Sequence, residues 1–255
     1  MSGGGASEFV AHEYGPRAQD YLTSAVHSGG ADLDQIEAEL QGHRNARVLD
    51  LGCGGGHVSF RAAPLVREVV ACDITPSMLE AVVSEANRRG LANVTVERCA
   101  AEDLPFPDDC FDFVLCRFTT HHWPSLDAGV RQARRVLKKK GRAIFVDSVS
   151  PQDATLDTHL QVIELLRDPS HVRNYTLAEW VAALSRSGFA ISGVVRRMLR
   201  MEFGTWTART RTAPARVEAI RLVQESAPPI VREHFAVSED GSFDLEAATF
   251  VVDAI

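Results

Sequence analysis

The stretch Ala46–His57, ARVLDLGCGGGH, joins a short apolar run to a glycine-rich turn. The apolar run predicts a buried strand, and residues 58–66 predict a helix after the turn. Glycine residues between a strand and a helix let a ligand approach the backbone closely. The stretch therefore predicts a βα unit with a ligand site at the carboxyl end of its strand.

Strands and helices alternate along the chain beyond this turn, which predicts βαβ units and a mostly parallel sheet. Strands are predicted at Glu68–Asp73, Asn93–Cys99, Phe111–Arg117, Gly141–Ser148, Phe189–Met201 and 245–255. Helices are predicted at Pro76–Arg89, Leu126–Lys138, Asp153–Arg167, Leu177–Ser187 and Ala213–Glu225. The regular alternation stops near Pro151, so the later part is expected to contain an insertion.

The residues around the turn discriminate between nucleotide ligands. A dinucleotide fingerprint reads G-x-G-x-x-G, but His57 occupies the position of its third glycine. Asp50 precedes the first glycine by two residues, where a carboxylate would repel a pyrophosphate and suit an ammonium group. Asp73 ends the second predicted strand and could accept hydrogen bonds from a ribose diol, although a role as a helix N-cap or a turn residue is the alternative. S-adenosylmethionine is a cationic nucleoside that fits this pattern.

Four motifs in order carry a family resemblance: VLDLGCGGG, VVACDITPSML, AAEDLPFPDDCFDFVLCRFTTHHW and RVLKKKGRAIFVD. With them, the chain resembles the class I S-adenosylmethionine-dependent methyltransferases, in the small-molecule branch (methyltransferase type 11) that includes the ubiquinone/menaquinone-biosynthesis enzymes. The resemblance covers roughly residues 46–150. It implies a doubly wound, Rossmann-like α/β fold whose seven-stranded, mostly parallel sheet has an antiparallel last strand. An N-terminal helical lid and an inserted helical segment complete the expected fold.

The resemblance also implies which residues bind S-adenosylmethionine and its product, S-adenosylhomocysteine. The glycine turn and the two acids would contact the methionine moiety and the ribose, and the later loops would contact the adenine and the transferred methyl group. The implied residues are Asp50, Gly52, Cys53, Gly54, Gly56, Asp73, Ile74, Met78, Ala101, Glu102, Cys116, Arg117 and Phe118. Ala100 stands where many relatives carry Asp, which removes one acceptor for the adenine amino group, and Lys138–Gly141 replaces a Lys-Pro-Gly-Gly turn.

Two further groups are candidates for a role at the site. Tyr14, Arg17 and Tyr21 resemble the entry helix of the same branch, and as a lid they could meet the sulfonium and the methionine carboxylate; core packing is the alternative. His121 and His122 follow the fourth strand and could include a general base, because imidazole titrates near neutral pH. A structural role, with one ring bonded to a backbone carbonyl, is the alternative. No metal site is expected, because a third ligand at suitable spacing is missing.

Composition limits the partners and the compartment. Lys and Arg number 27 against 34 Asp and Glu, so the net charge of −7 argues against a nucleic-acid partner. No apolar run is long enough for a membrane span, and five cysteines without a C-x-x-C pair favour a reducing cytoplasm. The late arginines Arg196, Arg197, Arg200, Arg209 and Arg211 could meet an anionic substrate, with ordinary surface positions as the alternative.

One domain over residues 1–255 is the simplest organisation. We expect a disordered tail and helical lid at 1–42, a cofactor-binding core at 43–150, and an insertion, substrate side and sheet completion at 151–255. The predicted function is methyl transfer to an O, C or N atom of a small organic acceptor, by a monomer or a homodimer. The alternatives are a catalytically silent S-adenosylmethionine-binding or interaction module and an NAD(P)-dependent oxidoreductase.

Overall fold

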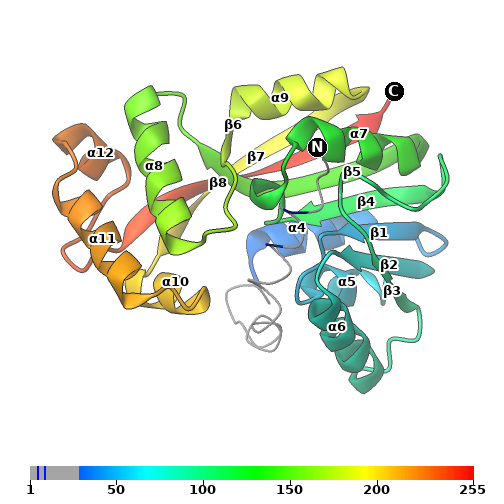
Figure 1. Cartoon of the computed structure of the whole chain (residues 1–255). Helices are drawn as coiled ribbons and strands as arrows, with labels where there is room; N and C mark the ends of the chain where they lie inside the picture. Colours follow the sequence, from blue (N-terminus) through cyan, green and yellow to red (C-terminus); the bar gives the residue numbers. More distant parts are fainter. Residues whose placement is uncertain (1–4, 6–8, 10–28) are drawn as a thin grey trace.

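A twisted sheet runs through the molecule and carries helices on both faces (Figure 1). The structure is a computed structural model and describes residue 5, residue 9 and residues 29–255. Within that part, seven strands follow the order β3-β2-β1-β4-β5-β8-β7, and the short β6 pairs with β5 beside them. The strands are β1 (Arg47–Leu51), β2 (Glu68–Asp73), β3 (Val94–Arg98), β4 (Phe111–Arg117), β5 (Leu137–Ser150), β6 (Tyr175–Thr176), β7 (Phe189–Met201) and β8 (Phe243–Ala254).

Helices alternate with strands over much of the chain, although β4 follows β3 directly and three helices lie between β7 and β8. The helices are α4 (Ala31–Leu40), α5 (His57–Ala62), α6 (Pro76–Arg88), the 3₁₀ turn η2 (Thr120–His122), α7 (Leu126–Val136), α8 (Ala154–Arg167), α9 (Leu177–Arg186), α10 (Phe203–Arg209), α11 (Pro214–Glu225) and α12 (Pro229–His234). The tail and most of the lid expected at 1–42, including Tyr14, Arg17 and Tyr21, lie outside the described residues.

The direction of the strands confirms the predicted fold class. Strands β1 to β5 pair in parallel with their neighbours, whereas β8, the last strand of the chain, is antiparallel to both β5 and β7. The order reverses between β1 and β4, since β2 and β3 lie on one side of β1 and β4 lies on the other. Parallel α/β sheets bind ligands at such a switch point, beyond the carboxyl ends of the strands.

Both faces of the central strands β1, β2 and β4 are buried, which explains why these strands are apolar runs without alternation. In β1, Leu49 and Leu51 face the cluster that α7 and α9 cover, and Val48 faces the cluster beneath α4 and α5. All three side chains are at most 1% exposed. This burial on both faces holds β1 in place and therefore fixes the position of the glycine turn that follows it.

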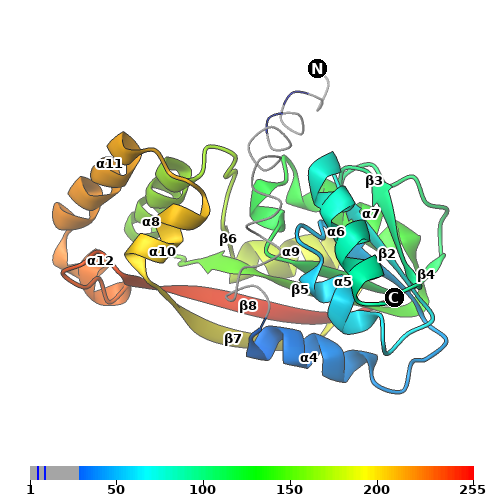
Figure 2. The ribbon, with the colours of Figure 1, turned by 90° about the horizontal axis from the view of Figure 1, so that it is seen from below.

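Three strands extend beyond the core of the sheet and carry a second group of helices. Strands β5, β7 and β8 contain 14, 13 and 12 residues, against 5 to 7 in β1 to β4. Figure 2 shows β7 and β8 passing beneath both helical groups, with α8, α10, α11 and α12 gathered at one end. Those helices form their own apolar cluster with Phe243 and Leu245 of β8. The fold thus has two groups of helices that pack on one shared sheet.

The predicted elements need correction around residue 137. The helix predicted to reach Lys138 ends at Val136, because Leu137 is fully buried and pairs with Phe111 as the start of β5. Residues 138–141 then bulge between two pairings of β4 with β5, and Lys140 has φ +64°. The three lysines at 138–140 therefore do not extend the helix; Lys138 instead binds Asp112, with 2.8 Å between Nζ and Oδ1.

Two short helices, α10 and α12, were not predicted from the sequence. The structure also bears on the expectations about cysteines and membrane spans. Helices α10 and α12 contain only seven and six residues, too few to establish a helical period. All five cysteines lie within the described residues, and each is a free thiol. No helix in the described part of the chain is long and apolar enough to cross a bilayer.

Candidate functional site

A cavity of about 800 Å³ opens along the carboxyl ends of β1, β2 and β4 and continues toward α8, α10 and β7. Its lining comes from two parts of the chain. We call the part lined by residues 29–124 the glycine-loop half and the part lined by residues 148–245 the arginine half. The volume falls in the upper part of the range of small-molecule sites, which reaches about 1,000 Å³.

The glycine turn after β1 forms one wall of this cavity. Gly52, Gly54 and Gly56 all have positive φ, of 72°, 48° and 78°. A Cβ on Gly52 would lie 2.4 Å from Oγ1 of Thr119, whereas the space beside Gly54 is open. Gly52, Cys53, Gly54 and Gly55 line the cavity. Gly56 does not; it packs on Phe60 and Val82, so it contributes to packing and not to the expected ligand contact.

Asp50 lies at the base of the cavity and is 1% exposed. Its Oδ2 accepts hydrogen bonds from the backbone N–H and the hydroxyl of Ser59, at 3.0 and 2.6 Å. Burial raises the pKa of this carboxyl to about 6, against the lowering effect of the Ser59 bonds. A cation in the cavity would stabilise the ionised form, so the site favours a positively charged group beside Asp50.

Asp73 joins the first two loops of the sheet edge. Its Oδ2 accepts from the N–H of Gly54 at 3.0 Å, and its Oδ1 accepts from the N–H of Thr75 at 2.9 Å. Thr75 and not Asp73 is the N-cap of α6, so Asp73 has the turn role of the two alternatives and does not cap the helix. The carboxylate keeps further lone pairs for a ligand because it has about four acceptor sites. Burial raises its pKa. Ile74 and Met78 line the cavity next to it.

The loop after β3 supplies the next part of the wall. Ala101 and Glu102 line the cavity, as do Cys99 and Ala100. Glu102 accepts a hydrogen bond from the N–H of Ser125 at 3.4 Å, and burial raises its pKa. This loop therefore lines the cavity with three small residues and one acid.

The three residues predicted at the end of β4 differ in whether they line the cavity. Cys116 is fully buried and does not line the cavity, whereas Arg117 and Phe118 do. Arg117 forms an ion pair with Asp32 of α4, whose side chains are only 7% and 12% exposed, and its guanidinium lies 4.9 Å from the Phe118 ring centroid. Phe118 has φ +50°, a strained backbone conformation for an aromatic residue that turns the chain at the cavity.

His121 and Asp147 form a buried pair where the two halves of the cavity meet. His121 Nδ1 lies 2.7 Å from Oδ1 of Asp147, which is 1% exposed. An ionised carboxylate only accepts, so Nδ1 carries the proton and Nε2 of the neutral ring is the acceptor. Burial lowers the pKa of His121, but the charge and hydrogen bond of Asp147 outweigh it and the net pKa is raised. His121 lines the cavity and can therefore accept a proton there.

His122 has different surroundings from its neighbour. Its Nδ1 lies 3.1 Å from the carbonyl oxygen of Ser170, the backbone contact that the structural alternative predicts. Burial lowers its pKa to about 4, so the ring is neutral. The ring of His171 lies 5.9 Å from that of His121, and burial lowers the pKa of His171 to about 3. Among residues 29–255, no group of three or more His, Cys, Asp or Glu is placed to hold a metal ion.

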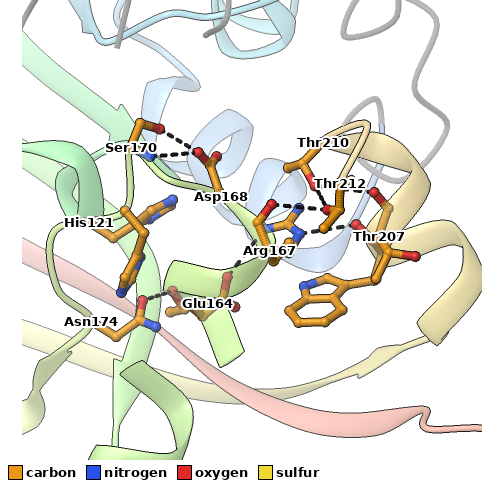
Figure 3. A network of polar contacts seen from close by, with 12 residues as sticks. His121, Glu164, Arg167, Asp168, Ser170, Asn174, Thr207, Thr210 and Thr212 are labelled. Atoms are coloured by element: carbon orange, nitrogen blue, oxygen red, sulfur yellow. Dashed lines mark hydrogen bonds and ion pairs between the residues drawn. The ribbon is translucent and has the colours of Figure 1, made fainter. Parts of the chain in front are cut away.

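The arginine half is built on α8 and α10. Arg167 pairs with Glu164 at 3.2 Å, donates from Nε to the carbonyl of Trp206 at 3.0 Å, and lies over the Trp206 ring. Figure 3 shows this pair between the turn that carries Thr207 to Thr212 and the region of His121 and Asn174. Arg197, Arg200 and Arg209 also line the cavity, whereas Arg196 and Arg211 do not.

Sequence reasoning missed Asp32 and Asp147, which pair with two of its candidates. Asp147 is a single carboxylate within the apolar strand GRAIFVDS, and such a residue in a buried strand signals a partner. Asp32 gives no comparable signal, because acids are common in the first turn of a helix.

Comparison with known proteins agrees with this geometry. A family model described as a methyltransferase domain matches residues 42–186. YafE of Escherichia coli is 42% identical over 192 residues, which are 75% of this chain and 93% of YafE. The Bacillus subtilis protein named uncharacterized methyltransferase YcgJ is 34% identical over 225 residues, 88% of this chain and 89% of YcgJ. The crystal structure of YcgJ superposes with a TM-score of 0.84, covering 88% of this chain and 97% of that one.

A third relative is similar over less than half of the chain. The ubiquinone/menaquinone biosynthesis C-methyltransferase UbiE of Shewanella oneidensis is 36% identical over 119 residues, 45% of this chain and 47% of UbiE. The motif-based resemblance is thus confirmed, and the family match extends over more than half of the chain. The protein belongs to the methyltransferase-domain family, in the class I small-molecule branch.

Proposed function

We propose that the protein transfers a methyl group from S-adenosylmethionine to a small organic acceptor, with His121 as the general base. The observation that carries this proposal is the His121–Asp147 pair, which lies in the cavity lined by the glycine turn and Asp73. S-adenosylmethionine would supply a methyl group that its sulfonium already activates, so the protein needs no covalent nucleophile.

The glycine-loop half suits a cationic nucleoside. Asp50 and Asp73 lie in the lining, and burial raises the pKa of both carboxyl groups, so a positive charge beside them is favoured. The space beside Gly54 is open, which allows a ligand to approach the backbone. Ile74 and Met78 provide apolar contacts for a base, and Asp73 retains acceptor capacity for the ribose hydroxyls.

His121 would remove the proton that an acceptor loses during transfer. Asp147 holds the ring in the tautomer that leaves Nε2 as an acceptor, and its charge stabilises the imidazolium that forms. The oxygen of Asp147 that does not face the ring accepts from the N–H of Thr120 at 2.8 Å, which fixes the carboxylate. We therefore propose acceptors with an ionisable group, such as a hydroxyl or an acidic C–H.

Turnover of methyl-labelled S-adenosylmethionine against phenols, quinones and organic acids tests the proposal. We expect His121→Gln to lower kcat about a hundredfold or more, the usual contribution of a general base. His122→Gln is the matched control, since its neighbouring ring is held by a backbone carbonyl and is already neutral; we expect a clearly smaller loss. Cofactor binding without turnover of any acceptor would favour a silent binding module, and equal losses in both variants would remove His121 as the base.

A further inference from the structure

Arg197 is a cation at the cavity wall with neutral hydrogen-bond partners. It lies on β7, and its guanidinium donates to Oγ1 of Thr249 at 2.8 Å and to Oε1 of Gln35 at 2.6 Å. Within residues 29–255 it forms no ion pair, and these bonds use two of its five N–H donors. Three donors and the whole charge therefore remain for a ligand.

Other arginines nearby differ from Arg197 because each faces a carboxylate. Arg196 pairs with Glu246 on the other side of the strand, and Arg200 binds Asp244 at 3.1 Å. Arg117 pairs with Asp32, and Arg167 pairs with Glu164. In a partly enclosed cavity, a guanidinium that has no carboxylate partner interacts favourably with an anion that enters.

The charges of the cavity divide between its two halves. In the described lining, the glycine-loop half has four carboxylates and one guanidinium: Asp32, Asp50, Asp73, Glu102 and Arg117. The arginine half has one carboxylate and four guanidinium groups: Glu164, Arg167, Arg197, Arg200 and Arg209. A cationic ligand is thus favoured in the first half and an anionic ligand in the second.

The rest of the arginine half is apolar. Met198, Leu199, Met201, Trp206 and Leu245 line it, and the indole of Trp206 is held under Arg167. Such a surface binds the hydrocarbon or aromatic body of a ligand and leaves its polar group to be placed by a few residues.

We propose that the methyl acceptor is an organic monoanion with an apolar or aromatic body, and that Arg197 binds its anionic group. This inference concerns the acceptor of the reaction proposed above and rests on it. Arg197 would act as a specificity-determining residue, since losing its charge removes the interaction that separates an anionic acceptor from a neutral one of the same shape.

Two matched fluorescent probes test the inference without turnover. 8-Anilinonaphthalene-1-sulfonate and N-phenyl-1-naphthylamine share an aromatic body, and only the first carries an anionic group. Both are titrated into the whole chain saturated with S-adenosylhomocysteine, whose own affinity is measured by calorimetry. We expect the wild-type protein to bind the sulfonate at least about tenfold more tightly, since hydrogen bonds between charged groups are the strong ones.

Variants of Arg197 assign the preference to one residue. Arg197→Gln should weaken binding of the sulfonate about tenfold and leave the neutral probe within twofold, whereas Arg197→Lys should keep part of the preference. Arg196→Gln is the control, because it removes an adjacent cation of the same strand that is outside the cavity lining.

The outcomes separate this inference from the proposed function. Equal affinity for the two probes, binding of neither probe, or an unchanged sulfonate affinity in Arg197→Gln would each overturn it, even where S-adenosylhomocysteine binds normally. Failure to bind S-adenosylhomocysteine would instead contradict the proposed function. If Arg197→Gln does not fold, the wild-type comparison of the two probes and the Arg197→Lys variant still decide the question.

Discussion

The two halves of the cavity are built in different ways. Short loops at the carboxyl ends of adjacent strands form the glycine-loop half, where the Asp73 side chain joins the β1 loop to the β2 loop through two backbone N–H groups. The arginine half is assembled from α8, α10 and the far ends of β7 and β8, which are distant in sequence from those loops. One half is thus a local property of consecutive strands, and the other depends on long strands that carry a second helical group.

This difference shows how one sheet can keep a nucleoside site and vary its second ligand. The loops after β1, β2 and β4 follow strands that are buried on both faces, so the backbone has little freedom there. The residues of the second half lie on an extension whose cluster is separate from the main core. Changes in the arginine half should therefore alter the choice of acceptor with little effect on cofactor binding.

The largest expected effect is on the pair that lies between the halves. Asp147→Asn should lower kcat by about a hundredfold to a thousandfold, because the ring loses the carboxylate that orients it and stabilises its charged form. Asp147 raises the pKa of His121, so the variant should also shift the acid limb of the pH–rate profile to lower pH. Stopped or continuous methyl-transfer assays across pH measure both. A loss of activity without that shift would indicate a structural role for Asp147.

The next effect concerns how much the ion pair between Asp32 and Arg117 contributes to the free energy of unfolding. Asp32→Ala would break the ion pair between Asp32 and the buried Arg117 guanidinium, and breaking a buried pair costs about 3 kcal/mol or more. Asp34→Ala, in the same first turn of α4, removes a pair whose carboxylate is 69% exposed and should cost less than about 1 kcal/mol. Urea unfolding of the two variants provides the comparison. Similar losses of unfolding free energy would show that the Asp32 pair is no more important than a surface contact.

A smaller effect is expected for cofactor affinity. Asp73→Ala should weaken S-adenosylmethionine binding at least about tenfold, because it removes a charged acceptor and the link between two loops. Asp73→Asn should have an intermediate effect, since its amide oxygen can still accept one backbone N–H. Calorimetric titration measures both, with Arg197→Gln as a variant that should keep wild-type affinity. Unchanged affinity in Asp73→Ala would remove Asp73 from the cofactor site.

The smallest effect is a pH dependence of the same affinity. Burial raises the pKa of Asp50 to about 6, so the carboxyl gains a proton as the pH falls through that value and no longer favours a cation. Affinity for S-adenosylmethionine should therefore be constant above neutral pH and fall by about fourfold or less between pH 7 and pH 5.5. Asp50→Asn should bind more weakly and lose this dependence. An affinity that rises on acidification would contradict the assignment.

Much of the fold was predictable because local patterns agreed with one another. Phe111–Arg117 and Phe189–Met201 were predicted with the bounds that the structure gives, since apolar runs flanked by turn residues are unambiguous. The error at Leu137 arose where a helical pattern continued into residues that pair with Phe111, and burial in the sheet outweighed the local preference. Gly56 and Cys116 were expected at the ligand and lie in the packing instead.

The sequence alone determined the glycine turn, the two acids after β1 and β2, and the family, because each depends on residues close together in the chain and on strands that end at one sheet edge. Only the tertiary structure decided the partners. Asp147 lies 26 residues from His121, Asp32 lies 85 from Arg117, and Gln35 lies 162 from Arg197. No local pattern encodes such contacts, because they exist only once the sheet brings its strands and both helical groups together. The charge of a residue follows from its identity in the sequence. Whether that charge is paired or available to a ligand depends on the tertiary packing around it.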